Sequence, residues 1–225
     1  MTGREAQTSR GRVLGALLVV FGLLAVVVAA LMLTGALQLL APTYSNEDFR
    51  IETYVSPHDE DGDGIDDQTD IIESARAYVA TRPRYGSAYY EGGWPDDGRG
   101  VCTDVVAYAL LGAGYDVRTL LNEDVLAHPE AYDIAVPDID IDYRRVEDLF
   151  VYFSRHATPL TLDPLDRKEW QGGDVVFFEG HVGIVSDRRN SRGVALVIHH
   201  ARVFQMAYEE DVLERLPIIG HFRVG

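Results

Sequence analysis

One run of the sequence, residues 13–40, contains no charged side chain and is rich in Leu, Val, Ala and Gly. A helix needs about 20 apolar residues to span a bilayer, so the length of this run predicts a transmembrane helix. The alternative is a secretory signal peptide, whose apolar part usually has only about 7–15 residues. The length favours an uncleaved anchor, and both interpretations place the rest of the chain outside the cytoplasm.

Charges on the two sides of this run indicate its orientation. Three arginines precede it within residues 1–12, whereas the first charged residues that follow are Glu47 and Asp48. Because positive residues next to a membrane helix stay in the cytoplasm, residues 1–12 are expected to form a cytoplasmic tail. The sequence therefore predicts a single-pass membrane protein with an extracytoplasmic C-terminal part.

The formal net charge of −16 limits the partners of the chain. A negative surface repels nucleic acid phosphate and anionic lipid head groups, so no nucleic acid partner is expected. Contact with the membrane is expected only through the N-terminal helix. The same charge also provides solubility, and it leaves the oligomeric state open.

The remaining sequence divides into an acidic stretch, residues 41–66, expected to be a stalk, and a folded domain, residues 67–225. Apolar residues at helical spacing come first in this domain, and short segments rich in Val, Ile and Phe follow Trp170. This order predicts an α+β fold in which helices pack on a small antiparallel sheet. The expected helices lie near residues 70–82, 101–112, 117–127 and 146–156, and the expected strands lie within 174–187, 193–201 and 218–224.

The chain has one cysteine, Cys102, which excludes an intramolecular disulfide. It falls in the first turn of a predicted helix, where unpaired amide hydrogens and the helix dipole favour a thiolate. We therefore expect Cys102 to be ionised near neutral pH and to act as a nucleophile. The alternative is that Cys102 is a small buried hydrophobic residue.

A cysteine nucleophile needs a base, and two histidines are suitably placed. His181 and His199 lie on predicted neighbouring strands joined by the turn at residues 188–193. Side chains alternate along a strand, so His199 and His200 point to opposite faces and only one of them can reach the site. The expected arrangement pairs Cys102 with His181, whose second ring nitrogen is held by His199.

The order of these motifs resembles that of the NlpC-type cell-wall peptidases: a cysteine at a helix start, GD before a strand, HVGIV, and a strand that ends in His. The resemblance is closest to one branch, the family called domain of unknown function 1287, over about Asp67–Phe222. It implies a papain-like, NlpC-type fold with Cys102 as the nucleophile, His181 as the base and His199 as the third residue. The matching segments are DDQTDI, YYEGGWP, GVCTDV, DIDYRRV, WQGGDVVFF, HVGIVSDRRN and GHFRV.

Three further residues, Tyr90, Asp104 and Arg145, lie in matching motifs and are candidates for supporting the site or the fold. Two departures from the pattern concern the site itself. NlpC-type enzymes usually have Asp before the cysteine and Ser-Gly after it, whereas here Val101 precedes it, so the pocket that faces the substrate is expected to differ. Asn usually follows the histidine at the strand end, and here His200 stands there, so His200 remains an alternative third residue.

The resemblance implies hydrolysis of amide bonds in peptidoglycan peptides through a Cys-His-His site that requires no cofactor. Two alternatives stay open. One is a module that binds or scaffolds the cell wall without turnover, and the other is an acyltransferase that passes the thioester's acyl group to an acceptor other than water.

A second candidate site lies in the acidic stretch, where Asp59, Asp61, Asp63 and Gly64 resemble the start of a calcium loop. Such a loop needs a bidentate Glu at its twelfth position, where this chain has Asp70, and no helix clearly precedes it. An acidic, solvated linker is the alternative. If Ca²⁺ binds, it is expected to stiffen the stalk and to take no part in catalysis.

Overall fold

The short apolar segments after Trp170 form the centre of the fold, a six-stranded sheet in which every neighbouring pair of strands is antiparallel. The computed structural model describes the backbone of residues 3–225 and the side chains of residues 17–225 except Leu33. The strand order is β3-β8-β4-β5-β6-β7. The strands are β3 (Thr158–Pro159), β4 (Val175–Phe178), β5 (His181–Arg189), β6 (Ala195–Ile198), β7 (Glu209–Glu210) and β8 (Ile218–Arg223).

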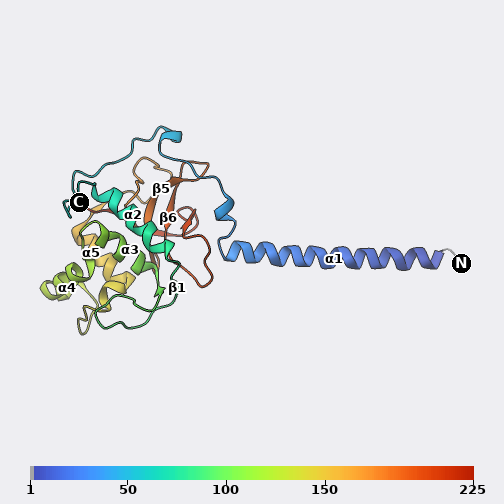
Figure 1. Ribbon diagram of the computed structural model, residues 1–225, viewed down its shortest axis with the longest axis horizontal. Helices are drawn as coiled ribbons and strands as arrows, with labels where there is room; N and C mark the ends of the chain where they lie inside the picture. The colour runs from blue at the N-terminus through green and yellow to red at the C-terminus, as the bar shows by residue number, and fades with distance from the viewer. Residues whose placement is uncertain (1–2) are drawn as a thin grey trace.

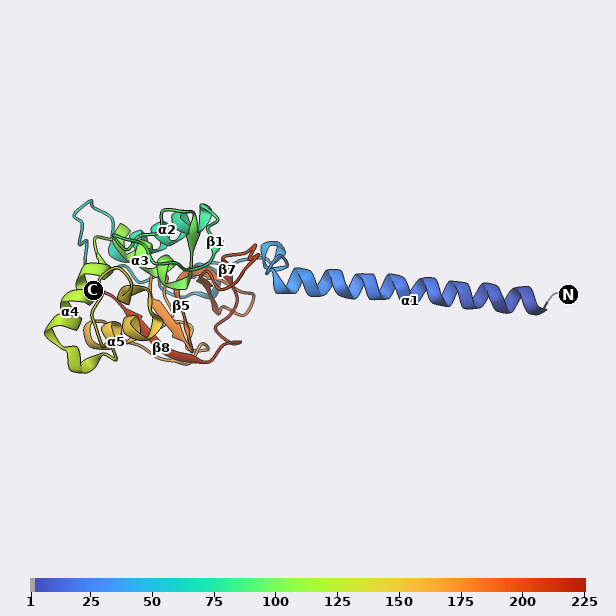
Figure 2. The same ribbon diagram turned by 90° about the horizontal axis from the view of Figure 1, so that it is seen from below.

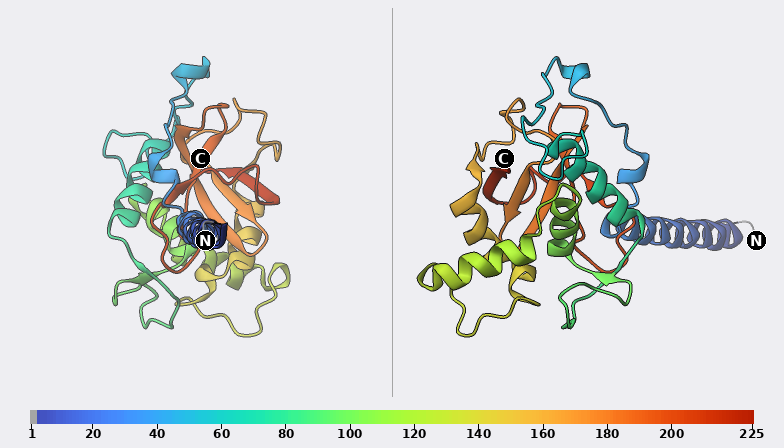
Figure 3. Two further views of the ribbon diagram at one scale, coloured as in Figure 1. Left: turned by 90° about the vertical axis from the view of Figure 1, so that its right-hand side faces the viewer. Right: turned by 60° about the vertical axis from the view of Figure 1, so that its left-hand side comes forward.

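Four helices precede most of this sheet in the chain, and they cover one of its faces (Figure 3). α2 packs against α3, and α3 packs on β5. A separate parallel pair, β1 (Arg84–Tyr85) and β2 (Arg99–Gly100), lies between α2 and α3 in sequence. The helices are α2 (Asp67–Ala80), α3 (Cys102–Gly112), α4 (Val117–Ala127) and α5 (Val146–His156).

Both faces of the sheet are buried, which explains why its strands read as continuous apolar runs. On β4, Val175 and Phe177 pack into the core beneath the helices. Val176 and Phe178 point the other way and pack with Trp170 in a second, smaller core. The mixed α/β architecture with an antiparallel sheet thus follows from helices and strands that each bury an apolar face.

Gly183 in the HVGIV segment lets side chains at the end of β6 pack closely against the backbone of β5. A Cβ atom at Gly183 would lie 2.6 Å from Val197 Cγ1 and 3.1 Å from His199 Cβ. The distance to Val197 is too short for a side chain and the distance to His199 is tight, so the glycine lets His199 lie over β5. This close approach brings His199 to the end of β5 where His181 begins the strand.

The acidic residues 41–66, predicted to be a stalk, lie along the domain in the structure. Tyr44 forms a β-bridge with Arg189 of β5. Asn46 is buried, and its side-chain amide donates to Gln171 at 3.0 Å. Ile51 and Ser56 are buried as well, so part of this polar segment covers the domain.

The apolar run at residues 13–40 is not one continuous helix. α1 (Gly3–Leu33) projects from the domain (Figures 1 and 2), and turns and a short 3-10 helix (Gln38–Leu40) follow it.

Within the part of the chain that the structure describes, no helix has both the length and the apolar character needed to cross a membrane. The predicted fold class is therefore wrong in its transmembrane helix, and the single-pass localisation built on that helix is wrong too. The predicted cytoplasmic tail, residues 1–12, and residues 13–16 of the run lie outside the residues whose side chains are described.

Candidate active site

Cys102 is the first residue of α3, and only 8% of it is exposed. Because α3 packs on β5, the sulfur lies against the start of that strand. The backbone N–H of Val182 donates a hydrogen bond to it. Val182 directly follows His181, so the only thiol of the chain and the predicted base lie at the same end of β5.

Burial dominates the ionisation of this thiol. Loss of hydration raises the pKa of Cys102 to about 11, although the backbone N–H groups of Val182 and Thr103 stabilise the thiolate. The carboxylate of Asp104 repels a negative sulfur and raises the pKa further. The expectation that Cys102 is ionised near neutral pH is therefore wrong for this structure. The helix terminus stabilises the thiolate by less than desolvation destabilises it.

His181 and His199 form a direct pair. The distance from His181 Nε2 to His199 Nδ1 is 2.8 Å, and the two rings meet edge to face. Burial, and then the neighbouring His199 and His200, lower the pKa of His181 to about 3. His181 is therefore neutral at neutral pH, like the thiol at the same end of β5.

Glu210, on β7, extends this pair and was not predicted from the sequence. Its Oε2 lies 3.2 Å from His199 Nε2, and its two carboxylate oxygens accept hydrogen bonds from Arg202 at 2.6 and 2.8 Å. Burial opposes ionisation of Glu210, but the neighbouring His199 and the hydrogen bonds from Arg202 lower its pKa. Glu210 thus carries a buried negative charge at the end of a chain that runs through His199 to His181. No sequence motif marks it, since only the pairing of β7 with β6 brings it there.

His200 occupies a different environment from His199. Its ring lies between Tyr85 and Tyr208, with centroid distances of 5.2 Å to each. Its Nδ1 has no hydrogen-bond partner among the described residues. Burial and the neighbouring His199 lower the pKa of His200 to about 4. The structure therefore places His199 against His181 and directs His200 toward the tyrosines.

Tyr85, on β1, is a second residue that the sequence did not single out. Burial, and the proximity of Cys102, raise the pKa of Tyr85. Tyr85 therefore belongs to the surroundings of the sulfur. The only sequence signal is its place in the Tyr-rich loop RYGSAYYEGG.

Asp104 and Arg144 support the start of α3. Asp104 accepts the backbone N–H of Val101 at 2.8 Å, which caps the helix that begins with Cys102. Arg144 Nε and an Arg144 terminal amine donate to the two oxygens of Asp104 at 2.8 and 3.0 Å, and both side chains are buried. Tyr90 stacks beneath the Arg144 guanidinium, 5.0 Å from the ring centroid. Arg145, the predicted candidate, has a half-exposed side chain 3.3 Å from Asp142. The residue that supports Asp104 at the start of α3 is therefore its neighbour Arg144.

Comparison with known proteins places the chain in a family. Residues 72–224 match the family described as Domain of unknown function (DUF1287). The chain belongs to this family. Its sequence is also 36% identical over 168 residues to "Uncharacterized protein YijF" of Escherichia coli (strain K12), covering 68% of this chain and 80% of the relative. No solved structure matches it.

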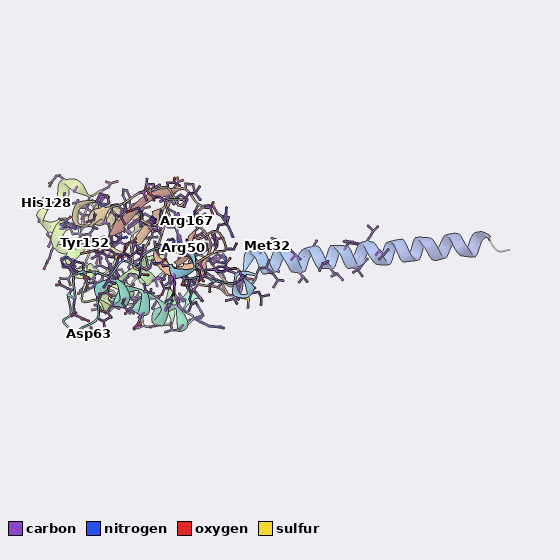
Figure 4. All side chains as sticks on the ribbon, turned by 90° about the horizontal axis from the view of Figure 1, so that it is seen from above. Met32, Arg50, Asp63, His128, Tyr152 and Arg167 are labelled. Atoms are coloured by element: carbon purple, nitrogen blue, oxygen red, sulfur yellow. The ribbon has the colours of Figure 1, made fainter. Side chains whose placement is uncertain are left out.

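His181, His199 and Glu210, which we call the histidine chain, lie within the residues matched to the DUF1287 family. The sulfur of Cys102, Tyr85 and Asp104 lie there as well. The predicted calcium loop precedes them. One carboxylate oxygen from each of Asp59, Asp61 and Asp63 lies within 4.8 Å of the others, on an exposed loop at the edge of the domain (Figure 4). Calcium binding by this loop stays a prediction of the sequence.

Proposed function

We propose that this DUF1287 protein is a cysteine hydrolase of the NlpC type that cleaves amide bonds through a covalent thioester. Cys102 is the nucleophile, His181 is the base and His199 is the third residue. The observation that carries the proposal is the 2.8 Å contact between His181 and His199 at the end of β5, next to a sulfur at a helix N-terminus. A purely structural cysteine needs neither histidine.

The ionisation of the site favours a neutral resting pair. Burial raises the pKa of Cys102 and lowers that of His181, which favours a neutral thiol and a neutral imidazole before substrate binds. His199 occupies Nε2 of His181, so Nδ1 is the nitrogen that accepts the thiol proton in the proposed reaction. In the proposed reaction, the thiol proton passes to His181 as the sulfur attacks the amide carbonyl.

The tetrahedral intermediate carries its negative charge on the former carbonyl oxygen. Backbone N–H groups at the start of α3 are the donors suited to hold it. The C–N bond then breaks as His181 gives its proton to the leaving amine, and a thioester forms on Cys102. Water, deprotonated by His181, cleaves the thioester and restores the thiol.

Glu210 gives His199 a role in both steps. When His181 takes up the proton it becomes a cation, and the buried carboxylate of Glu210, acting through His199, stabilises that charge. Glu210 is among the groups that raise the pKa of His181, against the larger effect of burial. The carboxylate thus favours the transition state more than the neutral resting state.

The resemblance of the motif order to NlpC-type cell-wall peptidases supports peptidoglycan peptides as the substrate. The test is digestion of purified peptidoglycan, with products identified by mass spectrometry. The wild-type protein is expected to release peptide fragments with a new amine and a new carboxylate, and Cys102→Ala and His181→Ala are expected to release none. His128→Ala, at the C-terminal end of α4 on the edge of the domain (Figure 4), is the matched control.

The same experiment separates the alternatives. Binding of peptidoglycan without new products, by a protein with an intact fold, would support a wall-binding module and contradict the hydrolase. Products that carry an added amine in place of the new carboxylate would show acyl transfer. Loss of folding in the Cys102 and His181 variants, seen by circular dichroism, would make these residues structural.

A further inference from the structure

A cavity of about 520 Å³ opens beside the histidine chain, between the β1–β2 pair and the loop after β6. We call it the arginine cavity. Its lining includes four arginines, together with a tyrosine and a histidine: Arg82, Arg84, Arg99, Arg202, Tyr85 and His200.

The charge of the arginine cavity is opposite to that of the chain. The protein has 36 acidic and 20 basic residues, yet no Asp or Glu lines this cavity. Arg202 is paired with Glu210, and Arg99 Nε lies 3.4 Å from Asp97. Arg84 donates to the backbone carbonyl of Asp97, and its charge helps to lower the pKa of the Asp97 carboxyl, whereas no ion pair of Arg82 is found among the described residues. The four arginines thus face two carboxylates, Glu210 and Asp97, and the concave site keeps a net positive charge.

His200 adds an unpartnered polar atom to the same cavity. The residue is 1% exposed, and its Nδ1 has no hydrogen-bond partner in the described part of the chain. A buried polar group without a partner carries a free energy penalty, so natural structures satisfy nearly all such groups. A ligand group in the arginine cavity is suited to complete the hydrogen bonding of His200.

The arginine cavity is lined by residues that neighbour the proposed site. Tyr85 lines it, and Cys102 is among the groups that raise the pKa of Tyr85, after burial. His200 lines it and directly follows His199 in the histidine chain. The arginine cavity therefore lies on the side of the proposed site where a flanking group of a peptide held at Cys102 would bind.

We propose that the arginine cavity binds a carboxylate of the substrate, so that the enzyme selects peptides with a free acidic group close to the amide it cleaves. The proposal rests on the proposed function, because it treats the cavity as part of the substrate site. Arginine suits this task because its planar guanidinium binds a carboxylate through two hydrogen bonds. Apolar neighbours such as Tyr85 and Met206 accommodate the peptide stem.

Binding can be tested without turnover. In the Cys102→Ser protein, calorimetry compares acetyl-Gly-Glu-amide with acetyl-Gly-Gln-amide, which differ only in the side-chain carboxylate. The acidic peptide is expected to bind about 10-fold more tightly at low salt, as for one charge-assisted hydrogen bond, and the preference should shrink as salt screens the charges. Equal dissociation constants for the two peptides would overturn the proposal.

A double variant, Arg82→Gln with Arg84→Gln, assigns the preference to the cavity. It is expected to bind both peptides equally, whereas Arg215→Gln, at an exposed arginine paired with Asp211, should keep the preference. Retention of the preference in the double variant, with its melting temperature unchanged, would also refute the proposal. If the acidic peptide binds as expected but peptidoglycan is not cleaved, only the hydrolase proposal fails.

Discussion

Replacing Glu210 by Gln tests whether the histidine chain needs a negative charge at its end. The substitution keeps the size of the side chain and one carbonyl oxygen for His199, but it removes the charge that stabilises His181 once protonated. Glu210 is buried and lies 3.2 Å from His199 Nε2, so water cannot replace its charge. The variant should therefore acylate more slowly while its active-site geometry persists.

The expected size follows from the contact that is weakened. A hydrogen bond to a charged group is worth about 1.5–3 kcal/mol, and each 1.36 kcal/mol in the barrier is tenfold in rate. Glu210→Gln should thus slow acylation of Cys102 by about 10- to 150-fold. The loss should vary little with pH between 6 and 9, because neither Cys102 nor His181 titrates in that interval.

The assay uses p-nitrophenyl acetate, an activated ester that acylates thiols without any need for the natural substrate. The rate of p-nitrophenolate release, minus the rate for Cys102→Ala, gives acylation at the site. Glu214→Gln, which removes a surface ion pair with Arg192, is the matched control and should behave like the wild type. An unchanged rate in a folded Glu210→Gln protein would refute the role assigned to this carboxylate.

Three further predictions follow from the ionisable groups. First, iodoacetamide should modify native Cys102 more slowly at pH 7.5 than the same thiol in urea, because burial raises the pKa of the native thiol to about 11. An alkylation rate of the native protein that stops rising with pH already below pH 7 would show an ionised thiol and contradict this. Second, Asp104→Ala should lower the free energy of unfolding by about 3–5 kcal/mol in urea titrations, because it leaves Arg144 buried without its partner; a loss below ~1 kcal/mol would show that the pair is dispensable. Third, Asp148 has a pKa raised to about 6, first by burial and then by Asp142, so its contribution to stability is fully present below its unfolded pKa and is lost as pH rises through 6. Asp148→Asn should therefore stabilise the protein at pH 8 by up to about 3 kcal/mol and have little effect at pH 3, and equal gains at both pH values would contradict the shift.

The helices and strands were largely predictable because each buries one apolar face at a regular spacing. The predicted helices at residues 117–127 and 146–156 coincide with α4 and α5, and Cys102 begins α3 as expected. Strand alternation predicted that only one of His199 and His200 reaches His181 but left the choice open, and the structure places His199 there.

Features that depend on contacts between distant segments were not predictable. The ionisation of Cys102 depends on how deeply α3 is buried against β5, which local sequence does not encode. Glu210 reaches His199 only because β7 pairs with β6. Arg144 and Arg145 are adjacent in sequence, and only the packing around Asp104 decides which of them is buried. The packing of residues 41–66 on the domain likewise depends on partners such as Arg189 and Gln171.

The most direct test of the account is to locate the acyl group. After brief exposure to p-nitrophenyl acetate, intact-mass and peptide-mapping spectrometry should find one acetyl group, on Cys102, that hydroxylamine removes and that His181→Ala fails to acquire. An unmodified Cys102 in a folded wild-type protein, or equal acetylation of Cys102 in the His181→Ala variant, would contradict the claim that His181 activates this thiol.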